Sequence, residues 1–100
     1  MTTATVDIGT MIARSPDMRG GRPRIAGTGV TVQRIVALFK LGLNPDEIAS
    51  EFGHLSYAQV YAALAYYHAN REEIEAALAE DEAAGDRAET EWYRSRRATA

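Results

Sequence analysis

The sequence contains no cysteine, only three prolines and no long apolar run. Without cysteine, the chain has neither a disulfide framework nor a thiolate metal site. No apolar stretch approaches the roughly 20 residues that a membrane-spanning helix needs. The first ten residues also lack the positive charges and the apolar run of a signal peptide. We therefore expect a cytoplasmic protein that does not contact the membrane.

The charge of the chain is unevenly distributed. The 100 residues suit one domain, and their net charge is −3. Residues 1–42 carry six basic and two acidic side chains, whereas residues 43–100 carry five basic and twelve acidic ones. The last nine residues are basic again. Such blocks favour different partners for different parts of the chain, although each block can also be a solvated face.

The N-terminal third is rich in turns. We expect residues 1–11 to form a flexible arm and residues 12–14 to form a short strand. Residues 20–30 contain four glycines and one proline, which excludes a helix. Pro23 fixes its own φ and favours extended neighbours, so residues 23–25 should form a second strand. A ribbon this small needs support from a helix or a second subunit.

Two short helices should follow the ribbon. The first begins at Thr31 and ends at Gly42, with an apolar face at helical spacing made of Val32, Ile35, Val36, Leu38 and Phe39. The second has Asn44 as its cap, Pro45 at its first position and Glu47 to complete a capping box. Gly53 should end it.

A longer helix should start at Ser56, which forms a second capping box with Gln59. Alanine and glutamate carry this pattern to about Glu82, before Gly85, which gives one helix of roughly 27 residues and about 40 Å. Its second half has no chain left to cover it and requires a partner. The polar tail from residue 87 should be mobile when the protein is alone.

The short helix, a four-residue connection and the longer helix have the spacing of a helix-turn-helix. In that motif the first turn of the second helix enters the major groove, and here it carries Ser56, Tyr57 and Gln59. Because this turn holds no arginine or lysine, phosphate contacts would come from the N-terminal block. The candidates are Arg19, Arg22, Arg24 and Arg34, with Arg14 as a further basic side chain. A three-helix bundle that binds no DNA is the alternative.

No group of residues indicates catalysis, a cofactor or a metal. His54 and His68 are 14 residues apart and lack carboxylates at metal spacing. The glycines around Arg22 do not have the spacing of a phosphate-binding loop. The acidic residues after position 71 fit a solvated helix face. We therefore expect a binding protein rather than an enzyme.

Several of these motifs, in this order, resemble the family catalogued as domain of unknown function 433. The resemblance covers roughly residues 12–78. It rests on Gly20-Gly21-Arg22-Pro23-Arg24-Ile25-Ala26-Gly27-Thr28, Leu41-Gly42-Leu43-Asn44-Pro45-Asp46-Glu47-Ile48, His54-Leu55-Ser56 and Val60-Tyr61-Ala62-Ala63-Leu64-Ala65-Tyr66-Tyr67. One departure is Gly29, because the family usually has arginine after Gly-Thr. Arg24 or Arg34 is expected to compensate for it.

The resemblance implies a mainly α fold, with a homeodomain-like helix-turn-helix core after a short β ribbon. It also implies an antitoxin of a type II toxin-antitoxin system, paired with a PIN-like ribonuclease toxin. We expect three parts, namely the flexible arm (1–11), the helix-turn-helix domain (12–78) and a C-terminal extension that binds the toxin (79–100). A homodimer, joined through the ribbon or the long helix, would bind operator DNA.

The C-terminal extension has the composition expected of the toxin-binding segment. A PIN-like nuclease holds Mg²⁺ with clustered carboxylates, and arginine forms bidentate bonds with carboxylates. We expect Trp92 and Tyr93 to anchor this segment on the toxin, and one of Arg94, Arg96 and Arg97 to enter its active site. The alternative function is a protein-interaction or dimerisation module with no DNA binding of its own.

Overall fold

The computed structural model describes residues 5–98, with side chains described through residue 85. This part of the chain is mainly helical, with four α-helices and one two-stranded sheet. In chain order the elements are η1 (Ile8–Met11), β1 (Ile12–Ala13), η2 (Arg19–Gly21), β2 (Arg24–Ile25), α1 (Val32–Lys40), α2 (Pro45–Phe52), α3 (Tyr57–Ala69) and α4 (Arg71–Ala98), where η marks a 3-10 helix.

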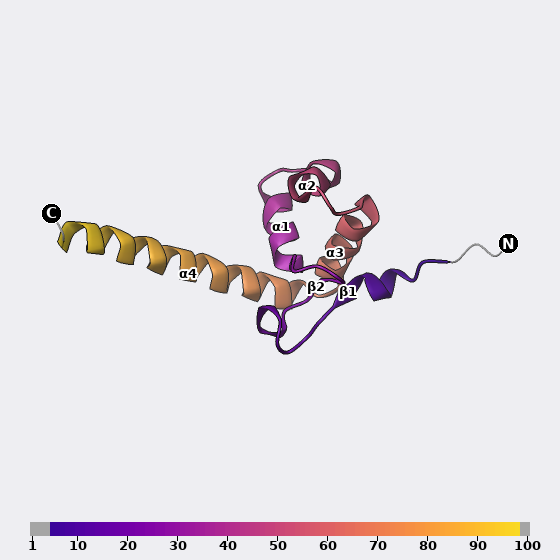
Figure 1. Ribbon diagram of the computed structural model, residues 1–100, viewed down its shortest axis with the longest axis horizontal. Coiled ribbons are helices and arrows are strands. Elements are labelled where there is room, and N and C mark those ends of the chain that lie inside the picture. The colour runs from indigo at the N-terminus through magenta and orange to yellow at the C-terminus, as the bar shows by residue number, and fades with distance from the viewer. Residues whose placement is uncertain (1–4, 99–100) are drawn as a thin grey trace.

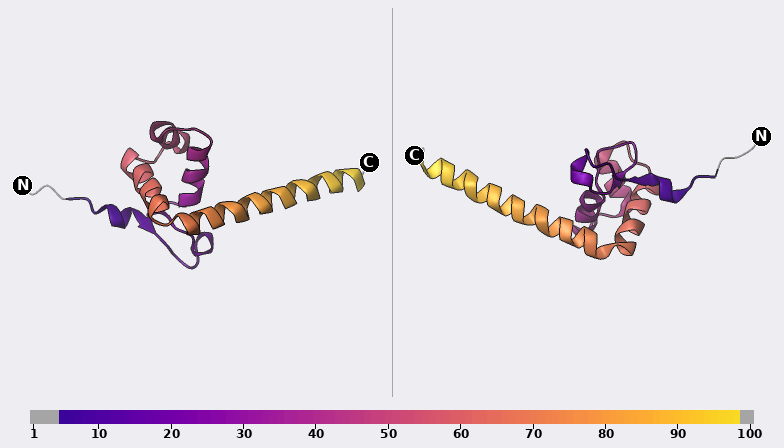
Figure 2. Two further views of the ribbon diagram at one scale, coloured as in Figure 1. Left: turned by 180° about the vertical axis from the view of Figure 1, so that it is seen from behind. Right: turned by 90° about the horizontal axis from the view of Figure 1, so that it is seen from below.

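Helices α1, α2 and α3 surround one core, and α4 extends from their base as a rod (Figure 1). The views from behind and from below show that α4 leaves the core on the side opposite the N-terminal segment (Figure 2). The outline is accordingly elongated, with extents of 69 × 28 × 22 Å.

The predicted ribbon is confirmed. Ile12 pairs with Ile25 and Ala13 with Arg24 in an antiparallel register. The turn after β2 closes through the Thr28 amide, which donates to the Ile25 carbonyl over 3.1 Å, with Gly27 at φ +79°. The ribbon contacts α3, so a helix supplies the support that it needs. Just before it, residues 8–11 form a 3-10 turn capped by Asp7, which differs from the flexible arm expected there.

The helix starts read from the sequence are confirmed by the hydrogen bonds. Thr31 caps α1, and the Asn44–Glu47 and Ser56–Gln59 pairs form complete capping boxes at α2 and α3. Gly53 ends α2 in the left-handed conformation, with φ +73°.

The prediction of one helix from Ser56 to about Glu82 is wrong, because the chain breaks at Asn70. This residue leaves the helical region, with φ −136° and ψ 46°, and separates α3 from α4. Its side-chain amide donates to the Tyr66 carbonyl over 3.1 Å, a local bond that competes with the helical pattern. The break redirects α4 so that Ile74 is fully buried against the core.

The predicted end of this helix before Gly85 is also wrong. Helix α4 continues through Gly85 to Ala98. A glycine inside a helix costs only about 1 kcal/mol relative to alanine, and strong helix formers surround this one. The tail that we expected to be mobile therefore has a helical backbone in the described range.

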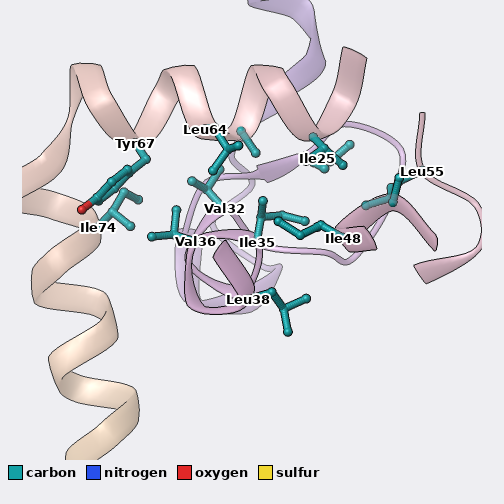
Figure 3. Close-up of a cluster of buried hydrophobic side chains, with 13 residues drawn as sticks. Ile25, Val32, Ile35, Val36, Leu38, Ile48, Leu55, Leu64, Tyr67 and Ile74 are labelled. Carbon is teal, nitrogen blue, oxygen red and sulfur yellow. The ribbon is translucent and has the colours of Figure 1, made fainter. Parts of the chain in front are cut away.

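The core lies where α1, α2 and α3 meet, and Figure 3 shows its side chains converging from all four helices and the ribbon. The fully buried members are Ile25, Val32, Ile35, Val36, Ile48, Val60, Ala63 and Ile74. Phe39, which its spacing places on the apolar face of α1, is 40% exposed. The face is therefore narrower than predicted, and the end of α1 presents an aromatic ring to solvent.

Ion pairs fix the first three turns of α4 to three separate segments. Glu73 pairs with Arg14 beside β1, and Glu75 pairs with Lys40 at the end of α1 over 2.6 Å. Arg22 binds both Glu80 and Asp81, at 2.8 and 2.7 Å. These exposed pairs contribute little individually, but as a set they determine the direction in which α4 leaves the core.

Candidate nucleic-acid interface

The first turn of α3 presents polar side chains to solvent. Ser56 and Tyr57 are exposed, and Tyr57 is 58% exposed. Gln59 is half-buried because its Oε1 accepts the Ser56 amide over 2.7 Å, while Ser56 Oγ accepts the Gln59 amide over 3.2 Å. The capping box thus uses the acceptor of Gln59 and leaves its two amide N–H donors for a ligand. Val60, the next residue, points into the core.

Two of the four arginines assigned to DNA are exposed. Arg34 lies on the open face of α1, and Arg19 lies in the turn that leads to β2. Neither forms an ion pair within residues 5–85. Arg19 has φ +50°, unusual for a residue with a side chain, and its Nε donates to the Gly29 carbonyl over 3.0 Å. Both guanidinium groups are available to bind an anion.

Arg22 is only partly available. Its hydrogen bonds to Asp81 and then to Glu80 raise the pKa of its guanidinium above the ordinary value. Its side chain is 30% exposed. A phosphate at Arg22 would have to compete with two carboxylates of α4.

Arg24 has a structural position, which corrects its assignment to the DNA surface. It is 8% exposed, and its Nη2 donates to Ser15 Oγ over 2.9 Å. Its Nη1 also lies 3.5 Å from the Thr28 carbonyl. The guanidinium therefore links the start of the ribbon to its turn and does not face a ligand. Beside a proline, a buried arginine and an exposed arginine look the same in the sequence, so the pattern could not predict the burial of Arg24.

The side chain of Arg19 packs against Gly29. A Cβ atom at this residue would lie 3.0 Å from Arg19 Nη2, because the guanidinium of Arg19 lies against the glycine. The positive charge beside Gly29 therefore comes from Arg19, whereas we expected Arg24 or Arg34 to compensate for the absent arginine. Sequence reasoning missed this pairing because ten residues separate the two positions.

An open hollow brings the N-terminal arginines to the turn that precedes α3. It has a volume of about 930 Å³, and we call it the arginine hollow. Its lining includes Arg19, Arg22, Gln33, Arg34, Phe52 and His54, with Glu80 at one edge. His54, whose Nδ1 lies 2.7 Å from the Phe52 carbonyl, stands two residues before the cap of α3. The hollow thus connects the basic block of the N-terminal third to the α2–α3 connection through Phe52 and His54.

The remaining candidates lie outside this face or outside the described side chains. His68 packs beside Tyr67, with ring centroids 5.1 Å apart, and Arg14 is held by Glu73 and Tyr66. Among the described residues, no group of three histidines or carboxylates is arranged to hold a metal. The toxin-binding candidates Trp92, Tyr93, Arg94, Arg96 and Arg97 lie in the C-terminal turns of α4, where only the backbone is described.

Comparison with known protein families establishes which family the chain belongs to. The family model described as protein of unknown function (DUF433) matches residues 12–67, more than half of the chain. The chain belongs to the DUF433 family. A crystal structure of a DUF433 member from Anabaena variabilis is similar, with 30% sequence identity and a TM-score of 0.67 over 70% of this chain and 69% of that one. No curated protein matches.

The DUF433 match spans the features described above. It begins at β1, includes the α2–α3 connection and every residue that lines the arginine hollow except Glu80, and ends at Tyr67, three residues before the break. Helix α4 lies outside it. None of the described helices has both the length and the apolar composition that would let it span a membrane.

Proposed function

We propose that this DUF433 member is a DNA-binding antitoxin of a type II toxin-antitoxin system. In this proposal α2, the Gly53–Ser56 connection and α3 form a homeodomain-like helix-turn-helix. The first turn of α3 enters the major groove of operator DNA, and the protein binds as a homodimer on a two-fold site. The C-terminal part of α4 neutralises a PIN-like ribonuclease.

One observation carries the DNA-binding half of the proposal. The arginine hollow places Arg19 and Arg34 next to His54, beside the start of α3. The first turn of α3 has no basic residue, so it needs cations from elsewhere to hold the phosphates beside the groove. In this proposal the arginine hollow supplies these cations, despite the net negative charge of the chain.

The capping geometry specifies how α3 would read bases. Because Gln59 Oε1 accepts the Ser56 amide, Gln59 offers donors to the groove. Donors match acceptor atoms such as guanine O6 and N7 or thymine O4. Tyr57, exposed one residue after the cap, is placed to contact a phosphate or an apolar base edge.

A substitution that preserves the fold tests this reading. A glutamate in place of Gln59 would still accept the Ser56 amide in the capping box but has no N–H donor, so Gln59→Glu removes base reading without removing the cap. We expect Gln59→Glu to weaken operator binding at least about 10-fold in fluorescence anisotropy, equivalent to about 1.4 kcal/mol. Its thermal stability should equal or exceed that of the wild type, because a carboxylate suits a helix N-terminus.

Ala65→Glu is the matched control, since Ala65 is exposed on α3 two turns beyond Gln59. It adds the same charge away from the proposed groove contact and should change affinity much less. Equal losses of operator affinity in the two variants would mean that the added negative charge alone weakens binding. If the wild type does not bind the operator at all, the alternative function, a dimerisation module with no DNA binding, is favoured. One observation favours the dimerisation module. Arg22 is engaged by Glu80 and Asp81 of α4, so this basic residue is less available to DNA.

A further inference from the structure

Two carboxylates of α4 occupy the guanidinium of Arg22 at the edge of the arginine hollow. Nη1 of Arg22 donates to Asp81 Oδ1 over 2.7 Å, and Nη2 donates to Glu80 Oε2 over 2.8 Å. Arginine binds a phosphate in a similar way, with two anionic oxygens on two of its nitrogens. The carboxylates therefore take the place at Arg22 that two phosphate oxygens would take.

The backbone that carries Arg22 is fixed independently of α4. The Arg22 amide donates to the Arg19 carbonyl over 3.2 Å, and the Pro23 carbonyl accepts the Val32 amide over 2.9 Å. Pro23 and Arg24, the two residues that follow, are buried. The position of Arg22 beside Arg19 and the start of α1 therefore does not depend on its contact with α4.

The turn of α4 that carries the two carboxylates lies beyond the core contacts of the helix among the described side chains. Ile74 is fully buried, and Leu78 is partly buried against the core. Residues 79–85 are exposed, and the side chains of Glu80 and Asp81 are 73% and 49% exposed. Because exposed ion pairs are individually weak, this turn can leave Arg22 without disturbing the core.

We propose that Glu80 and Asp81 form an autoinhibitory contact that masks a phosphate-binding arginine of the DNA interface. While the contact is made, the two carboxylates hold Arg22 and add negative charge beside the hollow. When it opens, Arg22 joins Arg19 and Arg34, which also line the hollow, as a third guanidinium group for the DNA backbone. This inference rests on the proposed DNA binding, and it adds that α4 lowers the affinity of the protein for DNA.

A double-mutant cycle between Arg22 and the two carboxylates tests the autoinhibitory contact. The neutralised chain carries Glu80→Gln and Asp81→Asn, and duplex DNA from the region upstream of the gene is titrated in fluorescence anisotropy. We expect the neutralised chain to bind this DNA about 10-fold more tightly than the wild type. Arg22→Gln should weaken binding about 5-fold more in the neutralised chain than in the wild type, because in the wild type the phosphate must first displace the carboxylates.

A chain with Glu72→Gln and Glu82→Gln is the matched control. It also removes two exposed carboxylates of α4, but neither of them forms an ion pair among the described residues. Its affinity for the DNA should rise by no more than about 2-fold, since exposed charges that do not touch the site are screened by salt. The neutralised chain should keep the helix content of the wild type by circular dichroism, because Ile74 and the ion pairs of Glu73 and Glu75 still hold α4.

The outcomes separate this inference from the proposed function. Equal losses from Arg22→Gln in the wild type and in the neutralised chain would overturn the autoinhibitory contact. An equal gain of affinity in the control chain would also overturn it, because the loss of negative charge would then explain the whole effect. Both results leave DNA binding by the wild type intact. No binding by either the wild type or the neutralised chain would instead contradict the proposed DNA binding itself.

Discussion

At the scale of single residues, similar side chains in the N-terminal third have different tasks. Arg24 is buried and joins the two ends of the ribbon, whereas Arg34 is exposed and free of ion pairs among the described residues. Arg22 lies between these cases, held by two carboxylates of α4. The basic charge of residues 1–42 is thus divided between side chains that hold the fold together and side chains that are exposed to solvent, which composition alone does not reveal.

The pair between Glu75 and Lys40 gives α4 a dependence on pH. The hydrogen bond from Lys40 and then that from Tyr67 hold the pKa of Glu75 below its ordinary value of 4.5. A carboxyl whose pKa is lower in the folded state stabilises fully above the unfolded value and loses this contribution as pH falls through the folded value. The stability of the wild type should therefore drop below pH 4.5 more steeply than that of Glu75→Gln.

Urea denaturation followed from neutral to acid pH measures this difference. Glu75→Gln should be the less stable protein at neutral pH, and the two curves should converge in acid. Glu72→Gln, an exposed carboxylate of the same helix without an ion pair among the described residues, should follow the wild type. A constant gap between the wild type and Glu75→Gln at all pH values would contradict the assignment.

At the scale of elements, the sequence predicted the parts that depend on neighbouring residues. The capping pairs Asn44–Glu47 and Ser56–Gln59 and the stop at Gly53 are local, and all three are confirmed. The break at Asn70 combines a local bond to the Tyr66 carbonyl with ion pairs between α4 and segments 30 to 60 positions earlier, and the sequence pattern does not reveal these distant pairs. The arginine hollow was likewise not predictable, because its lining comes from η2, the turn before α1, α1 itself, the end of α2 with the following connection, and α4.

Two glycines with opposite conformations test the description of the helices. Gly85 lies inside α4, and a Cβ built there meets nothing within 4 Å. Gly85→Ala should therefore raise helix content by circular dichroism and stabilise α4 by up to about 1 kcal/mol. Gly53 has φ +73°, so Gly53→Ala should destabilise the protein by about 1 kcal/mol although space is also free. Gly85→Ala without a gain in helix content would indicate that α4 ends earlier, as the sequence had suggested.

At the scale of the whole molecule, the fold separates the compact part of the chain from the C-terminal turns of α4. The arginine hollow and the first turn of α3 belong to the compact part, and α4 carries the C-terminal segment away from it (Figures 1 and 2). Among the side chains described through residue 85, the ion pairs of α4 reach as far as Asp81, so these pairs do not require the turns beyond it. Under the proposed function, operator binding and ribonuclease inhibition should therefore be separable by mutation.

A chain ending at Ala84 tests this separation, since it keeps every described ion pair and the whole core while removing Trp92 and the basic residues after it. We expect it to bind operator DNA within about 2-fold of the full chain, because exposed segments far from an interface change binding little. It should lose inhibition of the ribonuclease encoded beside it, measured by RNA cleavage. Gln59→Glu in the full chain should show the reverse pattern, with intact inhibition and weakened DNA binding. Inhibition at full strength by the shortened chain would place the toxin contact on the first turns of α4 or on the core, and would leave the DNA-binding half of the proposal standing.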